Sequence, residues 1–295
     1  MTKINTRVLM SGADYFSDDK AINAYMNADL AVDVEKAKTE HLSIREALES
    51  AGVEVVKVDP PASCQDGVYS ANWALTRGNK AVMSRLPNAR KAEEPYAEKV
   101  LKDLGFETIS VPDNLRFSGQ GDALPCGNYL LTGTEYRTDL EVHKFLADTL
   151  GYEVISLQTK PQRRFYGWGP RVTNASSGWP DSFYYDIDLA VSVIKAPDDT
   201  QPGLIAWCPK AFLKESVAKI RALPFDKIEV SFKEAQHAFA CNLVSTGETV
   251  IMSAFAPNLK AELEAKGLMV LTPVVTELGK GGGFIRCTTL TLDNS

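Results

Sequence analysis

The sequence predicts an α/β fold in which five strand–strand–helix–strand modules surround a pseudo-fivefold axis, as in a five-bladed propeller. Three observations support this prediction. A pattern of short apolar strand, amphipathic helix and second strand occurs five times. A further strand precedes four of the copies as the first arm of a hairpin. The fifth such strand ends the chain, where it can pair with the unpartnered N-terminal strand and remove two exposed sheet edges.

The five copies keep one order of elements. The first strands are expected at residues 7–12, 80–85, 129–134, 203–207 and 249–254. The helices are expected at residues 32–52, 93–105, 137–151, 209–224 and 257–267. The closing strands are expected at residues 53–60, 106–112, 152–158, 226–232 and 268–274.

The helices are predicted from periodicity and from their ends. In the first helix one face carries residues at a spacing of three to four, namely Val34, Ala37, His41, Ile44 and Leu48. Four helices are followed by a glycine where a left-handed residue commonly ends a helix, namely Gly52, Gly105, Gly151 and Gly267.

Hairpins distinguish this fold from its nearest alternative. The segments that form them are residues 71–84, 121–133, 188–207 and 241–253, with turns that contain Gly-Asn, Thr-Gly or a Pro/Asp/Gly loop. A doubly wound parallel sheet would explain the alternation of strands and helices, but it would leave these hairpins unexplained.

Composition restricts the class of protein. The 295 residues are 44% hydrophobic and 24% charged, which is typical of a globular chain, and we expect residues 1–295 to form a single domain. The net charge is −6 and the sequence contains no cluster of basic residues, which argues against nucleic acid as a partner. The N-terminus lacks an apolar signal segment, and no apolar run reaches the roughly 18 residues of a membrane span. Five dispersed cysteines and three histidines favour reduced thiols in the cytoplasm and no metal or organic cofactor.

Polar or reactive residues occupy matched positions in the five modules. Each hairpin's leading strand is expected to begin with one of them: Asn72, Asp122, Asp188, Asn242 and Cys287. In a closed ring, equivalent positions face the axis, so these side chains are expected to share a central cavity that suits a cationic ligand and a nucleophile. The alternative is that each residue merely caps its strand.

Several segments carry a family resemblance, among them DGVYSANWAL, FSGQGDAL, FYYDIDLAVSVI and KGGGFIRCTTLTL. They make the whole chain similar to the amidinotransferase and dimethylarginine dimethylaminohydrolase family, which is related to the arginine deiminases. The resemblance implies the pentein fold, which is the five-module propeller described above. It also implies a small-molecule guanidino substrate, and relatives commonly self-associate, so a homodimer is a further expectation.

The resemblance assigns roles to individual residues. Cys287 matches the family's nucleophile, which attacks the guanidinium carbon and forms a covalent thiouronium. Asp188 matches the aspartate that grips the guanidinium, and Asn72 lies where relatives carry Asp or Asn near that group. Arg85 and Arg137 match arginines that bind a substrate carboxylate in relatives, although ordinary ion pairs are the alternative for both.

Two positions depart from the family pattern. Asp186 occupies the place of the family's general acid/base histidine, and Ser118 follows Phe117 where relatives carry an acidic residue. A buried aspartate beside a second carboxylate can still hold a proton and act in its place. The leading hypothesis is therefore a guanidino-group hydrolase. The alternative is a member of the family that binds a guanidino ligand or a partner without turnover.

A long connection precedes the altered strand. Residues 158–182 contain Trp168, Trp179 and three arginines, and they lack periodicity. We expect this segment to form a lid over the cavity, with a surface loop as the alternative.

Overall fold

The computed structural model describes residues 2–27 and 30–295, and in these residues the strands form five three-stranded sheets. In each sheet the middle strand pairs antiparallel with a leading strand and parallel with a closing strand. A helix connects the two parallel strands. The prediction of five strand–strand–helix–strand modules is therefore confirmed.

The modules follow one another along the chain. The first contains β15 (Leu290–Thr291), β1 (Arg7–Ser11), α1 (Val34–Ser50) and β2 (Glu54–Val58). The second contains β3 (Ala74–Arg77), β4 (Lys80–Met83), α2 (Glu93–Asp103) and β5 (Glu107–Ser110). The third contains β6 (Ala123–Cys126), β7 (Tyr129–Gly133), α3 (Leu140–Leu150) and β8 (Glu153–Leu157). The fourth contains β9 (Val191–Lys195), β10 (Leu204–Trp207), α5 (Lys214–Ala222) and β11 (Asp226–Glu229). The fifth contains β12 (Val244–Ser245), β13 (Thr249–Ile251), α7 (Pro257–Ala265) and β14 (Met269–Leu271).

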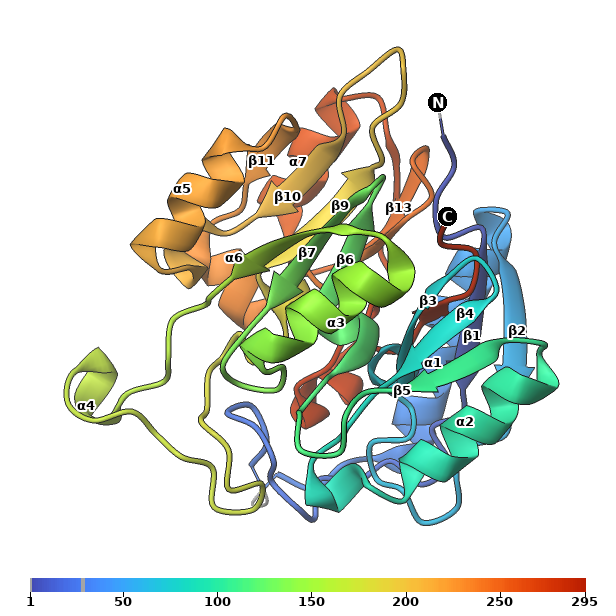
Figure 1. The fold of residues 1–295 in the computed structure, drawn as a ribbon, viewed down its shortest axis with the longest axis vertical. Helices are drawn as coiled ribbons and strands as arrows, with labels where there is room; N and C mark the ends of the chain where they lie inside the picture. The colour runs from blue at the N-terminus through green and yellow to red at the C-terminus, as the bar shows by residue number, and fades with distance from the viewer. Residues whose placement is uncertain (1, 28–29) are drawn as a thin grey trace.

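The two ends of the chain close the ring, as expected. β15 pairs antiparallel with β1, with Val8 opposite Thr291 and Leu9 opposite Leu290. The termini consequently lie close together (Figure 1). This pairing gives the N-terminal module the leading strand that its own sequence lacks.

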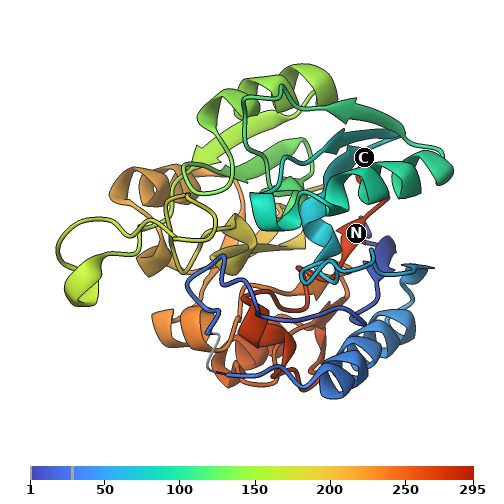
Figure 2. The same cartoon turned by 90° about the horizontal axis from the view of Figure 1, so that it is seen from below.

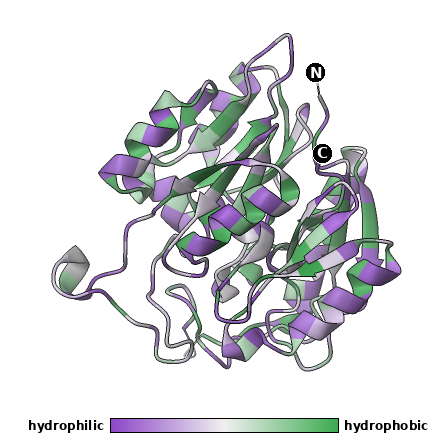
Figure 3. Cartoon of the chain, in the orientation of Figure 1, coloured by the Kyte–Doolittle hydropathy of each residue, from purple (hydrophilic) through white to green (hydrophobic). Residues whose placement is uncertain are grey.

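The helices lie at the periphery of the molecule and the strands lie inside it (Figure 2). The strands are mainly hydrophobic, whereas the helices carry both polar and apolar residues (Figure 3). In α1 the fully buried positions are Ala37, Ile44 and Leu48, as the periodicity predicts. The same helix also buries Glu40, which an apolar stripe does not predict.

The glycines at the ends of four helices have left-handed backbone conformations. Their φ angles are +81° at Gly52, +91° at Gly105, +74° at Gly151 and +78° at Gly267. These values bear out the C-terminal positions assigned from the sequence. Two helix starts were wrong. α3 starts at Leu140 rather than at residue 137, and residues 209–224 contain a short 3-10 turn at Pro209–Ala211 before α5 starts at Lys214.

Short 3-10 turns precede three of the leading strands and carry polar residues of the predicted site. These turns are η1 (Ser70–Trp73), η3 (Gly119–Gly121) and η4 (Ile187–Leu189). Asn72 and Asp188 lie within such turns, and Cys287 precedes the start of β15. The polar positions therefore lie just before the strands, rather than at their first residues as we expected.

The segment 158–182 has a structured base and a projecting tip. Isolated bridges join Arg163 to Arg171 and Thr173 to Pro180. The tip carries α4 (Arg164–Gly167), and both views show it extending away from the ring (Figures 1 and 2). The tip therefore does not lie over the centre of the ring, where we expected a lid. Across residues 2–27 and 30–295, no helix has the length and apolar character needed to cross a membrane.

Candidate active site

Cys287 lies in a buried polar cluster to which residues of several modules contribute. Its thiol donates a hydrogen bond to Oδ2 of Asp188 at 3.3 Å. The side-chain amide of Asn242 donates to the sulfur at 3.2 Å, and Oδ1 of the same asparagine accepts the Cys287 backbone amide at 3.1 Å. Two residues distant in sequence, Asp188 and Asn242, thus contact the sulfur atom, and these contacts fix the direction of the thiol.

Asp188 of η4 and Asp186, which directly precedes η4, each have one buried carboxyl oxygen without a hydrogen-bond partner among the described residues. Oδ2 of Asp186 accepts a hydrogen bond from Asn72, and Oδ2 of Asp188 accepts the thiol proton. Oδ1 of each carboxyl group is buried and has no hydrogen-bond partner in the described part of the chain. Buried acceptors are normally satisfied, so an unpaired pair in one cluster indicates a place for a donor-rich ligand.

Asn72 connects the cluster to the neighbouring module. Its Nδ2 donates to Oδ2 of Asp186 at 2.8 Å, to Oγ of Ser118 at 2.9 Å and to the Ser118 carbonyl at 3.1 Å. Its Oδ1 accepts a hydrogen bond from Arg90 at 2.8 Å. All of its polar atoms are therefore engaged, which fixes the amide orientation.

The cluster requires a very close approach of backbone and side chains at Gly121. A Cβ atom at this position would lie 2.8 Å from Oδ2 of Asp186 and closer still to the side-chain amide of Asn72. Glycine therefore allows η3 to pack against both residues. An alanine there would separate Asn72 from Asp186.

Burial dominates the protonation of these groups. It raises the pKa of Asp188 to about 8, with the neighbouring Asp186 adding to the shift. Burial also raises the pKa of Asp186, although the nearby Arg137 guanidinium opposes the shift. The pKa of Cys287 is likewise raised by burial and by the carboxylates of Asp188 and Asp186. The thiol therefore holds its proton, and a bound cation would favour the thiolate.

Asp122 and Arg137 lie beside this cluster. Oδ1 of Asp122 accepts the backbone amide of Ile187 at 2.9 Å, and burial raises its pKa well above the usual range. The guanidinium of Arg137 lies 4.0 Å from the ring centre of Tyr185 and donates to the Ile22 carbonyl at 3.3 Å. Arg137 thus places a buried positive charge within reach of Asp186.

Arg85 has other partners. It pairs with Asp113 at 2.5 Å and with Glu94 at 3.6 Å, and its backbone forms a bridge with Phe117. The structure brings together the other predicted residues, which are Cys287, Asp188, Asp186, Asn72, Ser118, Asp122, Asn242 and Arg137. Arg85 instead forms ion pairs with Asp113 and Glu94, which was the alternative interpretation of this residue.

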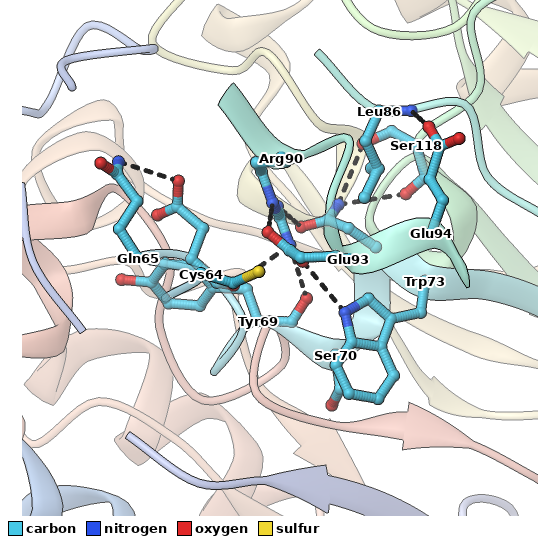
Figure 4. A network of polar contacts seen from close by, with 12 residues as sticks. Cys64, Gln65, Tyr69, Ser70, Trp73, Leu86, Arg90, Glu93, Glu94 and Ser118 are labelled. Atoms are coloured by element: carbon cyan, nitrogen blue, oxygen red, sulfur yellow. Dashed lines mark hydrogen bonds and ion pairs between the residues drawn. The ribbon is translucent and has the colours of Figure 1, made fainter. Parts of the chain in front are cut away.

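A buried ion pair between Arg90 and Glu93 was missed from the sequence (Figure 4), and its arginine is the residue that donates to Asn72. Arg90 and Glu93 form two hydrogen bonds of 2.8 and 2.7 Å, and both side chains are almost fully buried. Arg90 also donates to the carbonyls of Asp66 and Tyr69, and Trp73 donates to Glu93 at 3.0 Å. The only signal for this pair in the sequence is an Arg and a Glu three residues apart, which usually indicates a surface pair.

A cavity of about 350 Å³ approaches the cluster from the face that carries both termini. Residues near the two chain ends line this cavity. Asp188 of the polar cluster and the neighbouring Arg286 also line it. The guanidinium of Arg286 is held by Gln120 at 2.8 Å and by the Thr289 carbonyl at 2.9 Å. Cys287 is not among the described residues that line this cavity, so the cavity borders the cluster without opening onto the thiol.

Comparisons with known proteins agree with this architecture. The family model for eukaryotic N,N-dimethylarginine dimethylhydrolase matches residues 13–166. ArgZ of Synechocystis, a bifunctional arginine dihydrolase/ornithine cyclodeaminase, is 30% identical over 294 residues, covering 96% of this chain and 37% of that protein. The chain thus spans little more than a third of this bifunctional relative. The N(G),N(G)-dimethylarginine dimethylaminohydrolase of Mycobacterium tuberculosis is 29% identical over 285 residues, covering 96% of this chain and 85% of that enzyme.

Solved structures match along nearly the whole chain. The N-terminal domain of cyanobacterial ArgZ, solved as a cysteine-to-serine mutant bound to substrate, has a TM-score of 0.84 at 28% identity and covers 98% of both chains. The same domain has also been solved covalently bound to a reaction intermediate, with a TM-score of 0.83 at 28% identity and 98% of both chains covered. The enzyme of Pseudomonas aeruginosa in complex with citrulline shares the fold, with a TM-score of 0.71 at 16% identity and coverage of 97% and 99%. The chain belongs to the dimethylarginine dimethylaminohydrolase family.

Proposed function

We propose that this protein hydrolyses the guanidino group of an arginine-like small molecule through a covalent intermediate on Cys287. The observation that carries the proposal is the thiol of Cys287 beside two buried carboxyl groups, each with one unpaired oxygen. A guanidinium offers five N–H donors in a planar fork and a positive charge, so it satisfies both oxygens. The relatives named above are arginine dihydrolases and dimethylarginine dimethylaminohydrolases.

In the first step the thiol attacks the guanidinium carbon. A bound guanidinium favours the carboxylate form of Asp188, which lies 3.3 Å from the sulfur and takes the Cys287 proton as the carbon–sulfur bond forms. One carbon–nitrogen bond then breaks, and its electron pair leaves with the nitrogen. That nitrogen takes a proton from the carboxyl group of Asp186 and departs as ammonia or an amine. A covalent thiouronium remains on the sulfur.

In the second step water replaces the sulfur. The water gives one proton to the Asp186 carboxylate and its oxygen adds to the carbon. The carbon–sulfur electron pair then returns to Cys287, and the new hydroxyl group releases its remaining proton to solvent as the ureido carbonyl forms. Asp188 then returns the proton to the thiolate. The net reaction converts a guanidino group and water into a ureido group and an amine. Arg137, buried and cationic beside Tyr185, is the group we assign to a substrate carboxylate.

Turnover is tested with a panel of L-arginine and its N-methylated forms, with ammonia, alkylamine and ureido product measured separately. Intact-mass spectrometry of the same reactions reports any adduct on the protein. Product formation with a transient adduct on Cys287 is the expected result. The absence of both, in a folded protein, would contradict the proposal.

A second candidate function is binding without turnover, and one observation favours it. The cluster holds Asp186 and Ser118 where the family resemblance implies a histidine and an acidic residue. The described residues place no histidine in hydrogen-bond contact with it, and His143 is bound instead to Ser156 and the Gly133 carbonyl. Calorimetric binding of a guanidino compound without any product would support this second function.

Replacing Asp186 by asparagine separates a proton-donating role from a packing role. An asparagine keeps the size of the side chain but cannot release a proton, so we expect kcat to fall by roughly 100-fold or more. The acid acts in its protonated form, so wild-type kcat is expected to fall as pH rises through the elevated pKa of Asp186. That limb of the pH profile is expected to disappear in the variant.

Asp181→Asn is the matched control. Asp181 lies five residues before Asp186, its carboxyl group is buried, and burial raises its pKa too. We expect its kcat and pH profile to match those of the wild type. An unchanged kcat in Asp186→Asn would show that Asp186 only holds Asn72.

A further inference from the structure

Glu40 of α1 binds the backbone immediately before the turn that leads to Cys287. Its Oε1 accepts hydrogen bonds from the amide and hydroxyl of Thr276, both at 2.8 Å, and from the Glu277 amide at 3.0 Å. Its Oε2 accepts the amides of Glu277 at 2.8 Å and Leu278 at 3.1 Å. These amides lie where η6 (Leu278–Gly281) begins, so one buried carboxylate satisfies donors that would otherwise be unpaired.

Three side chains from other parts of the chain bind carbonyl groups of the same turn and of Gly282, which follows it. Tyr69 donates to the Leu278 carbonyl at 2.6 Å. Asn23 donates to the Gly281 carbonyl at 2.9 Å, and Tyr185 donates to the Gly282 carbonyl at 2.7 Å. The turn is therefore bound on its amide side by Glu40 and on its carbonyl side by three separate donors.

The position of this turn affects the thiol. A Cβ atom on Gly283, two residues after η6, would lie only 3.0 Å from Cβ of Cys287, which shows how closely the backbone that follows the turn packs on the nucleophile's side chain. Burial and the carboxylates of Asp188 and Asp186 raise the pKa of Cys287, and a hydrogen bond from the Phe284 backbone amide opposes them. Displacing the turn would move that amide away from the sulfur.

We propose that Glu40 is a positioning residue, which holds η6 and the backbone that follows it so that the Cys287 thiol is correctly oriented and activated. Glu40 lies on a peripheral helix of the first module and does not touch the polar cluster through any of the bonds described above. The inference rests on the proposed function in one respect, because it takes Cys287 as the nucleophile.

Glu234 provides a matched control for a buried glutamate that binds backbone amides. It lies on α6 (Phe232–His237), is buried to the same degree as Glu40, and accepts the amides of Asn258 at 2.8 Å and Leu259 at 3.1 Å. These amides begin α7 rather than the turn before Cys287. Losing either carboxylate is therefore expected to lower the stability of the fold, whereas only Glu40 binds the backbone that leads to Cys287.

The experiment compares Glu40→Gln with Glu234→Gln. The rate at which chloroacetamidine alkylates Cys287 is measured across a pH series by mass spectrometry with peptide mapping, and the Tm of each protein is measured in parallel. We expect both variants to lower Tm by a few degrees, about as much as the loss of one or two buried hydrogen bonds requires. Only Glu40→Gln is expected to slow the alkylation of Cys287, by about ten-fold, and to shift its pH profile upward.

Equal rates and pH profiles for Glu40→Gln and the wild type, with Tm lowered as in Glu234→Gln, would overturn the proposal. If Glu40→Gln does not fold, Thr276→Val removes a single hydroxyl contact with Glu40. This variant is expected to shift the profile in the same direction by a smaller amount, and an unchanged profile would again overturn the proposal. Failure of wild-type Cys287 to react at any pH would instead contradict the proposed function.

Discussion

Replacing Cys287 by alanine is expected to abolish turnover of every guanidino substrate and to remove the covalent adduct. The alanine cannot form the carbon–sulfur bond, and loss of a covalent nucleophile costs on the order of 10⁶-fold in kcat in a well-studied protease. Binding is expected to persist, because Asp188 and Asp186 keep their unpaired oxygens. Product assays, intact-mass spectrometry and calorimetric titration of the same preparation measure these three properties.

Cys126→Ala is the control for this variant. Cys126 is a fully buried thiol of β6, and its replacement removes the same atoms from the core without touching the polar cluster. We expect it to cost about 1–2 kcal/mol of stability and to leave turnover unchanged. Equal turnover by Cys287→Ala and the wild type would exclude covalent chemistry at this cysteine.

Replacing Arg90 by methionine is expected to cause the largest loss of stability among single substitutions in the site. Arg90 and Glu93 form a fully buried pair, and removing one partner of such a pair costs about 3–5 kcal/mol because the other charge is left uncompensated. The Tm is expected to fall by on the order of 10 °C. Asn72 also loses the donor to its Oδ1, so its amide can rotate away from Asp186. A fall in kcat is therefore expected even at temperatures where the variant remains folded.

A double-mutant cycle tests the cause of this loss. Arg90→Met combined with Glu93→Leu removes both charges, so the double variant is expected to be less destabilised than the sum of the single variants. Arg116→Met is the control, because the Arg116–Asp139 pair is partly exposed. It is expected to cost less than Arg90→Met. Additive effects of Arg90 and Glu93 on the free energy of unfolding would contradict the buried-pair interpretation.

The fivefold repetition of one pattern of strands and helix made the fold predictable from the sequence. Each module carries its own hairpin, helix and closing strand, and local signals such as the glycines at the ends of the helices mark the boundaries. Ring closure followed from counting strands, because one module lacked a leading strand and the C-terminus supplied an extra one. The matched polar positions likewise predicted that Asn72, Asp188 and Cys287 share one cluster, since repeated modules place equivalent residues at equivalent distances from the axis.

Contacts between residues far apart in sequence decided the rest. The sequence by itself determined the five-module architecture and most members of the polar cluster, because both depend on patterns that recur along the chain. Only the tertiary structure decided that Arg85 pairs with acidic residues, that Arg90 and Glu93 support Asn72, and that Glu40 binds the turn before Cys287. A charged residue on a helix or loop has the same local sequence signal whether it meets water or a buried partner, and burial of the partner determines its role.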